Sequence, residues 1–199
     1  MDNIQIFISE NWISLVGAII GLAYLYLEYR ANVWMWLASL VMAAFYIYIF
    51  HSTQLYASMA IYVYFFFASI YGWIMWRKKN RNMQTGEEVI ARMPQKYFSF
   101  IIIAIAVVFA VIFILLKSFS WNSYFVTTGD ALTTSLNIVA LWMISRKWAD
   151  MWLLLIPANF LSSALLFVQQ DLFSGILFLI FAVVSIGGFY NWRSLSRKA

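Results

Sequence analysis

The sequence has no cysteine, two prolines, one histidine and eight acidic residues among its 199. The absence of cysteine excludes disulfides, thiolate metal sites and cysteine nucleophiles. The sequence patterns GxSxG and HExxH, phosphate loops and dinucleotide fingerprints are missing as well. We therefore expect no enzymatic activity, no metal site and no cofactor.

Charged residues make up 11% of the chain, whereas hydrophobic residues make up 64% and aromatic residues 20%. A water-soluble domain of this length has no core large enough to bury so much apolar surface. The apolar segments are continuous rather than alternating, which predicts an all-α integral membrane protein rather than a barrel. Seven segments are long enough to cross about 30 Å of hydrocarbon as helices: 12–29, 33–50, 55–76, 97–116, 129–145, 150–168 and 172–192.

Basic residues fall almost entirely on one side of these seven predicted transmembrane segments. Lys117 is the one exception, and it shares its side with Asp2, Glu10, Asp130 and Asp171. The positive-inside rule then places the N-terminus outside and the C-terminus in the cytoplasm. The net charge of +5 thus reflects topology and the anionic lipid bilayer, and no nucleic-acid partner is expected.

A shift of 116 residues aligns residues 30–77 with 146–193 without a gap. Twelve of these forty-eight positions are identical, whereas shared apolar composition would give roughly four or five. Two parallel three-helix units need an odd number of crossings between them, which predicts a parallel 3+1+3 repeat bundle. The predicted parts are a first repeat (1–76), a cytoplasmic loop (77–96), a linker transmembrane helix (97–117), a second repeat (128–192) and a cytoplasmic tail (193–199).

Parallel repeats of this kind are typical of small transporters whose substrate lies between the repeats, near the midplane. Pro157 and Asn159 stand halfway along the sixth segment, and we expect a kink that turns Asn159 inward. Asn159 either bonds a neighbouring helix or binds the substrate beside Trp152. Every Asp, Glu, Lys and Arg lies at the end of a segment or in a loop, so no buried carboxylate is expected to carry protons or sodium. This pattern favours a uniporter.

Two sets of residues resemble PnuC-type vitamin transporters. LeuTyrAlaSer 55–58, PhePhe 65–66 and IleTyrGlyTrp 70–73 resemble that family's third core helix. SerArgLys 145–147 with Trp152 and Asn159 resemble its basic residues followed by Trp-x-x-Trp-x-x-x-Asn. The resemblance covers about residues 12–197. It implies a seven-helix bundle, usually a homotrimer, in the bacterial inner membrane. It also implies facilitated diffusion of a vitamin precursor that a cytoplasmic kinase traps.

Departures from the family pattern bear on the substrate. Members that carry nicotinamide riboside typically have a second Trp at the position of Leu155. They also tend to have Gln at the position of Tyr62, Asn at that of Ser69, and Asn near the end of the final helix, where this chain has Gly187. Fewer polar ligands and an added Tyr favour thiamine, because its cationic ring suits aromatic walls. Nicotinamide riboside and riboflavin are the alternatives. A sugar-type small transporter and a non-transporting scaffold agree less well with the polar residues.

On this hypothesis Trp152, Trp73 and Tyr62 stack on the substrate. Hydrogen bonds are assigned to Asn159, Asn137 and Tyr190. The remaining predicted substrate-binding residues are Thr134, Trp36, Ser69 and Asn191. Asp130, expected at the outer mouth, either attracts cations or serves as the N-terminal carboxylate of its helix.

Overall fold

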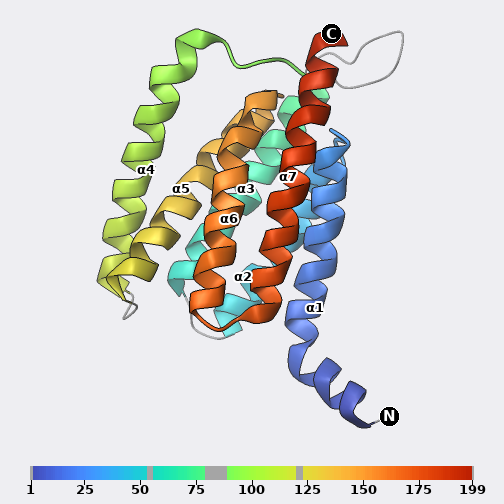
Figure 1. Cartoon of the computed structure of the whole chain (residues 1–199), viewed down its shortest axis with the longest axis vertical. Coiled ribbons are helices and arrows are strands. Elements are labelled where there is room, and N and C mark those ends of the chain that lie inside the picture. Colours follow the sequence, from blue (N-terminus) through green and yellow to red (C-terminus); the bar gives the residue numbers. More distant parts are fainter. Residues whose placement is uncertain (1, 53–55, 79–88, 120–122, 199) are drawn as a thin grey trace.

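The computed structural model describes residues 2–52, 56–78, 89–119 and 123–198. These residues form α1 (Asp2–Tyr29), α2 (Met35–Ser52), α3 (Tyr56–Lys78), α4 (Phe98–Phe119), α5 (Tyr124–Ser145), α6 (Trp152–Val168) and α7 (Leu172–Lys198). Single 3-10 turns, Gln95–Tyr97 and Ala149–Met151, precede α4 and α6. The predicted all-α fold of seven helices is confirmed (Figure 1). Residues 79–88 of the predicted loop, together with Gln54 and Leu55, lie outside the described residues.

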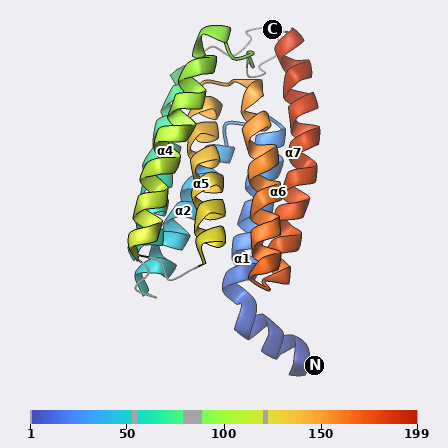
Figure 2. The ribbon, with the colours of Figure 1, turned by 60° about the vertical axis from the view of Figure 1, so that its left-hand side comes forward.

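The described helices include five that are long and apolar enough to cross a membrane, and α1 contains the shorter apolar stretch Leu15–Tyr29. The helices stand side by side in a bundle, with α4 at one edge against α5 and α1 beside α7 (Figures 1 and 2). Apolar side chains such as Phe100, Ile103 and Ile114 are exposed on α4, the helix at the edge of the bundle (Figure 1). Residues 89–97 cross the end of the bundle where α1, α3, α5 and α7 finish, hereafter the loop end.

The 116-residue repeat reappears in the contacts between the two halves. The indole nitrogen of Trp76 donates a hydrogen bond to the Ile144 carbonyl at 2.8 Å. Trp192, 116 residues after Trp76, donates to the Glu28 carbonyl, also at 2.8 Å. Since Ile144 follows Glu28 by the same interval, the last helix of each repeat binds the first helix of the other. The two repeats are therefore joined by a reciprocal pair of hydrogen bonds.

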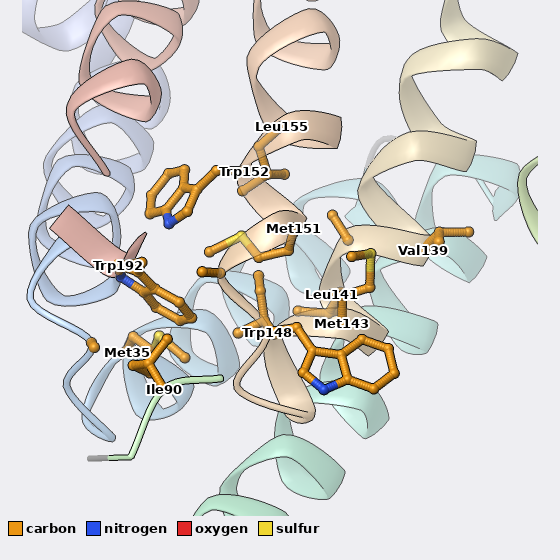
Figure 3. Close-up of a cluster of buried hydrophobic side chains, with 14 of the residues drawn as sticks. Met35, Ile90, Val139, Leu141, Met143, Trp148, Met151, Trp152, Leu155 and Trp192 are labelled. Atoms are coloured by element: carbon orange, nitrogen blue, oxygen red, sulfur yellow. The ribbon is translucent and has the colours of Figure 1, made fainter. Parts of the chain in front are cut away.

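A second set of repeat-related contacts forms a tryptophan layer, defined as Trp36, Trp76, Trp152 and Trp192, each no more than 1% exposed. Ring centroids are 6.1 Å apart for Trp36 and Trp76, 6.0 Å for Trp152 and Trp192, and 6.1 Å for Trp76 and Trp192. The rings therefore form a continuous chain across the interface of the repeats, close to the loop end. Figure 3 shows two of them, Trp152 and Trp192. Such a layer fills space that water could otherwise occupy.

Glycine makes room for this layer in both repeats. The Trp36 ring packs on the backbone at Gly72, and the Trp152 ring packs in the same way on Gly188. A Cβ atom at Gly188 would stand 2.5 Å from Cζ2 of Trp152, well inside van der Waals contact. Because α7 is helical here, the requirement for glycine is one of space and not of backbone conformation.

Gly188→Ala is expected to destabilise the protein by about 1–2 kcal/mol, because the ring or the helix must shift to admit the methyl group. The neighbouring change Gly187→Ala is a matched control, since its Cβ would meet only Cε2 of Tyr29 at an ordinary 3.5 Å. Thermal unfolding in detergent, followed by tryptophan fluorescence, measures both. Equal unfolding temperatures for the two variants would contradict the packing argument.

Residues 89–97, which precede α4, close the loop end over these tryptophans. Ala91 pairs with the α5–α6 connection through two backbone hydrogen bonds of 2.9 Å, from its N–H to the Lys147 carbonyl and from the Ala149 N–H to its own carbonyl. The Met93 N–H donates to Oδ2 of Asp150 at 2.6 Å. Ile90, 1% exposed, lies in the buried cluster that also contains Met35 and Trp192 (Figure 3). Ile90 is thus part of the core, and the hydrogen bonds of Ala91 and Met93 attach this segment to the α5–α6 connection.

Candidate functional site

A cavity of about 320 Å³ lies between the two repeats. Its lining, as far as the described residues show, comes from α1, α2, α3, α5, α6 and α7, and α4 contributes none of it. The volume is at the lower end of the range of roughly 300–1,000 Å³ that is usual for small-molecule sites. Its position matches the expected place of a substrate in a transporter built from parallel repeats. We call it the central cavity.

Repeat-equivalent positions line the central cavity from both sides, which places it on the axis that relates the repeats. The pairs are Gly21 with Asn137, Leu25 with Leu141, Ser39 with Leu155, Ala43 with Asn159, Tyr62 with Phe178, and Phe65 with Phe181. Both carboxamides belong to the second repeat, and glycine or alanine occupies the equivalent positions of the first. Across the axis, Ala43 presents only a methyl group to the cavity, whereas Gly21 makes room for the Phe181 ring, whose Cζ would lie 3.1 Å from a Cβ atom there.

Asn159 is held by a short chain of hydrogen bonds. Its Nδ2 donates to Oγ of Ser185 at 3.1 Å, and that hydroxyl donates to the Phe181 carbonyl at 2.7 Å. Since the single hydroxyl proton of Ser185 is used on Phe181, its oxygen must accept from Asn159. Oδ1 of Asn159 then remains as an acceptor at the cavity wall. Pro157 lies inside α6, which continues on both sides of it, and Asn159 reaches the cavity two residues later.

Asn137 and Tyr62, also predicted as substrate-binding residues, line the central cavity too. Nδ2 of Asn137 donates a hydrogen bond to the Thr133 carbonyl at 2.9 Å. As in Asn159, this bond through Nδ2 fixes the orientation of the side-chain amide and leaves Oδ1 as an acceptor. The Tyr62 ring packs at 4.8 Å from Tyr46 and 5.4 Å from Phe50, measured between ring centroids. The cavity therefore combines two amide acceptors with an aromatic wall.

The predicted stacking tryptophans lie elsewhere. Trp36 and Trp152 belong to the tryptophan layer, and their indole nitrogens are buried without a hydrogen-bond partner among the described residues. Trp73 is half-buried and packs edge-on against Trp34 at 5.6 Å. None of the three lines the central cavity. Trp36 and Trp152 pack instead against Gly72 of α3 and Gly188 of α7.

The remaining predicted residues are also not brought to the central cavity. Ser69 is buried and bonds Ser39 at 2.7 Å, and Asn191 donates to the Tyr29 carbonyl at 2.7 Å. Tyr190 is 69% exposed. Thr134 and Asp130 are half-buried on α5 and do not line the cavity. Of the ten predicted binding residues, the structure brings together Asn137, Asn159 and Tyr62.

The expectation that no carboxylate is buried is wrong. Glu28 is 2% exposed and lines the central cavity, and the Tyr24 hydroxyl donates to its Oε1 at 3.1 Å. Sequence reasoning missed Glu28 because it precedes Tyr29 and Arg30, where the apolar segment ends and an interfacial charge is common. The signal that could have found it is the four-residue spacing from Tyr24, which puts both polar side chains on one helix face.

The family model described as "Nicotinamide mononucleotide transporter" matches residues 11–194. Among curated proteins, the chain is 24% identical over 191 residues to a nicotinamide riboside transporter PnuC of Haemophilus influenzae, covering 95% of this chain and 82% of that one. It is 26% identical over 195 residues to the riboflavin/roseoflavin transporter RibM of Streptomyces davaonensis, covering 94% and 87%. Both alignments include nearly the whole bundle.

A solved structure shares the fold. The crystal structure of the vitamin B3 transporter PnuC superimposes with a TM-score of 0.79 at 21% sequence identity, covering 99% of this chain and 87% of that one. At this level of identity the likeness establishes the arrangement of the helices, while the identity of a ligand depends on individual side chains.

Proposed function

Because the chain belongs to the nicotinamide mononucleotide transporter family, we propose that it carries nicotinamide riboside across the membrane through the central cavity. The observation that carries this proposal is a cavity between the repeats that presents two anchored carboxamides beside aromatic rings. The amide N–H of a nicotinamide group can donate a hydrogen bond to Oδ1 of Asn159 or Asn137. Its flat ring can pack against the aromatic wall near Tyr62.

The substrate assignment departs from the sequence-based preference for thiamine. The relatives named above are described as nicotinamide riboside or riboflavin transporters, not as thiamine carriers. Riboflavin is the second candidate, supported by the Streptomyces relative and by the aromatic residues Tyr62, Phe65 and Phe181. The cavity volume of about 320 Å³ favours a riboside whose base is a single ring over a flavin, whose ring system has three fused rings.

The proposed mechanism is facilitated diffusion across the bacterial inner membrane, followed by trapping of the vitamin by a cytoplasmic kinase. We further propose that the N-terminus lies outside and that the protein is a homotrimer. The expectation of uniport depends partly on the absence of a buried carboxylate, and the burial of Glu28 removes that argument. Transport therefore has to be measured with and without ion gradients.

Uptake of labelled nicotinamide riboside into liposomes that contain the purified protein tests the proposal. We expect uptake that stops at equal concentrations, is unchanged by pH or sodium gradients, and is inhibited by unlabelled nicotinamide riboside more strongly than by riboflavin or thiamine. Stronger inhibition by riboflavin would select the second candidate. Accumulation above the outside concentration in a pH gradient would replace uniport by proton coupling.

A further inference from the structure

Glu28 is a buried acidic residue at the central cavity that the proposed function leaves without a role. It is 2% exposed, and among the described residues its side chain is hydrogen-bonded to the Tyr24 hydroxyl, at 3.1 Å. Within the described part of the chain, no Lys, Arg or His forms an ion pair with it. A buried carboxylate without a countercharge is strongly unfavourable. The cavity is the place from which a compensating charge can come.

The position of Glu28 suits recognition of a charge. Its backbone carbonyl is fixed by hydrogen bonds from the Trp192 indole at 2.8 Å and the Ala31 N–H at 2.9 Å. Leu25, Leu141 and Leu155 supply apolar cavity lining, and the Trp192 bond ties the Glu28 backbone directly to the tryptophan layer. In such a low-dielectric setting, attraction between the carboxylate and a ligand cation is stronger than in water.

The acidic residue is present in one repeat alone. The positions 116 residues after Tyr24 and Glu28 are Ala140 and Ile144, whereas the carboxamides Asn137 and Asn159 belong to the second repeat. The central cavity therefore carries a carboxylate from one repeat and amide groups from the other. A ligand with a positive ring and a hydrogen-bonding substituent matches this asymmetry.

We propose that Glu28, held by Tyr24, recognises the delocalised positive charge of the transported vitamin and selects cationic rings over neutral ones. The chemistry fits the pyridinium of nicotinamide riboside and the thiazolium of thiamine, and offers nothing to a neutral flavin. For the pyridinium, the inference rests on the proposed function. Tyr24 acts as a positioning residue, because its hydroxyl orients the carboxylate.

The test compares nicotinamide riboside with its reduced form, which has a neutral dihydropyridine ring and nearly the same shape. In liposomes, the wild type is expected to take up the cation with a half-saturating concentration about tenfold lower than that of the neutral form, the usual effect of one charged partner. Glu28→Gln is expected to bring the two concentrations within about twofold of each other, mainly by weakening uptake of the cation.

Asp171→Asn is the matched control, because it makes the same chemical change at an exposed residue that caps α7 through the Ser174 N–H at 3.0 Å. In this variant, the ratio of the half-saturating concentrations for the two ribosides should equal the ratio in the wild type. If Glu28→Gln weakens both ribosides equally, or removes a dependence on a pH gradient, Glu28 has a structural or proton-carrying role and the inference is overturned.

The proposed function and this inference fail separately. If the wild type takes up neither riboside, the proposed function fails, and the same comparison is made with thiamine against riboflavin. If the wild type prefers thiamine to riboflavin and Glu28→Gln abolishes that preference, recognition of charge by Glu28 is supported even though the proposed function has failed. Equal uptake of the two by the wild type would overturn it.

Discussion

Replacing Asn159 with alanine is expected to reduce uptake of nicotinamide riboside ten- to hundredfold while the protein remains folded. Asn159 lines the central cavity, and the bond from its Nδ2 to Ser185 holds Oδ1 as an acceptor at the wall. A ligand N–H that loses this acceptor inside the cavity stays unsatisfied, which costs roughly 1.5–3 kcal/mol in binding. Liposome uptake at several substrate concentrations measures the loss.

Ser163→Ala is the matched control for Asn159→Ala. Ser163 lies one turn further along α6, is 3% exposed, and donates to the Gly175 carbonyl at 2.8 Å, but does not line the cavity. Its removal deletes a buried polar contact between the same two helices, so it should lower thermal stability and leave the half-saturating concentration unchanged. Wild-type uptake by Asn159→Ala would remove this residue from the site. A similar loss in both variants would point to helix packing instead.

Trp76→Phe and Trp192→Phe are expected to destabilise the protein by about 2–3 kcal/mol each, and Trp36→Phe and Trp152→Phe by about 1 kcal/mol or less. All four changes remove a similar volume from the buried layer. The first pair also loses an indole hydrogen bond of 2.8 Å between the repeats, whereas the second pair loses an N–H that is buried without a partner. Removing an unsatisfied donor offsets part of the packing loss.

Thermal unfolding in detergent, with each variant compared with its repeat-equivalent, tests this difference. The unfolding temperatures should group Trp76 with Trp192 and Trp36 with Trp152. A grouping by repeat, with Trp36 and Trp76 alike, would show that the reciprocal hydrogen bonds contribute little. Uptake by the folded variants serves as a second measurement, because the layer lies outside the cavity and should affect transport mainly through stability.

Much of the architecture could be read from the sequence. Long apolar segments can satisfy their backbone hydrogen bonds in lipid only as helices, so composition and length predict the seven elements. The interval of 116 residues predicts the pairing of the two halves, and the structure shows that interval in the bonds from Trp76 to Ile144 and from Trp192 to Glu28. Asn137, Asn159 and Tyr62 could be found because polar groups inside an apolar helix need a partner or a ligand.

The tertiary structure alone decided the burial of Glu28 and the destination of the tryptophans. Hydropathy places Glu28 at the end of a segment, but whether such a residue meets water depends on which helix packs over it, and here α7 of the other repeat covers it through Trp192. Trp36 and Trp152 are aromatic residues of the kind that stack on flat ligands, yet their rings lie outside the cavity. They pack on Gly72 and Gly188, each thirty-six positions further along the chain. Sequence determines which segments enter the membrane, because transfer into lipid depends on local composition. Which side chains line a cavity depends on contacts between residues far apart in the chain, and these exist only once the repeats have packed together.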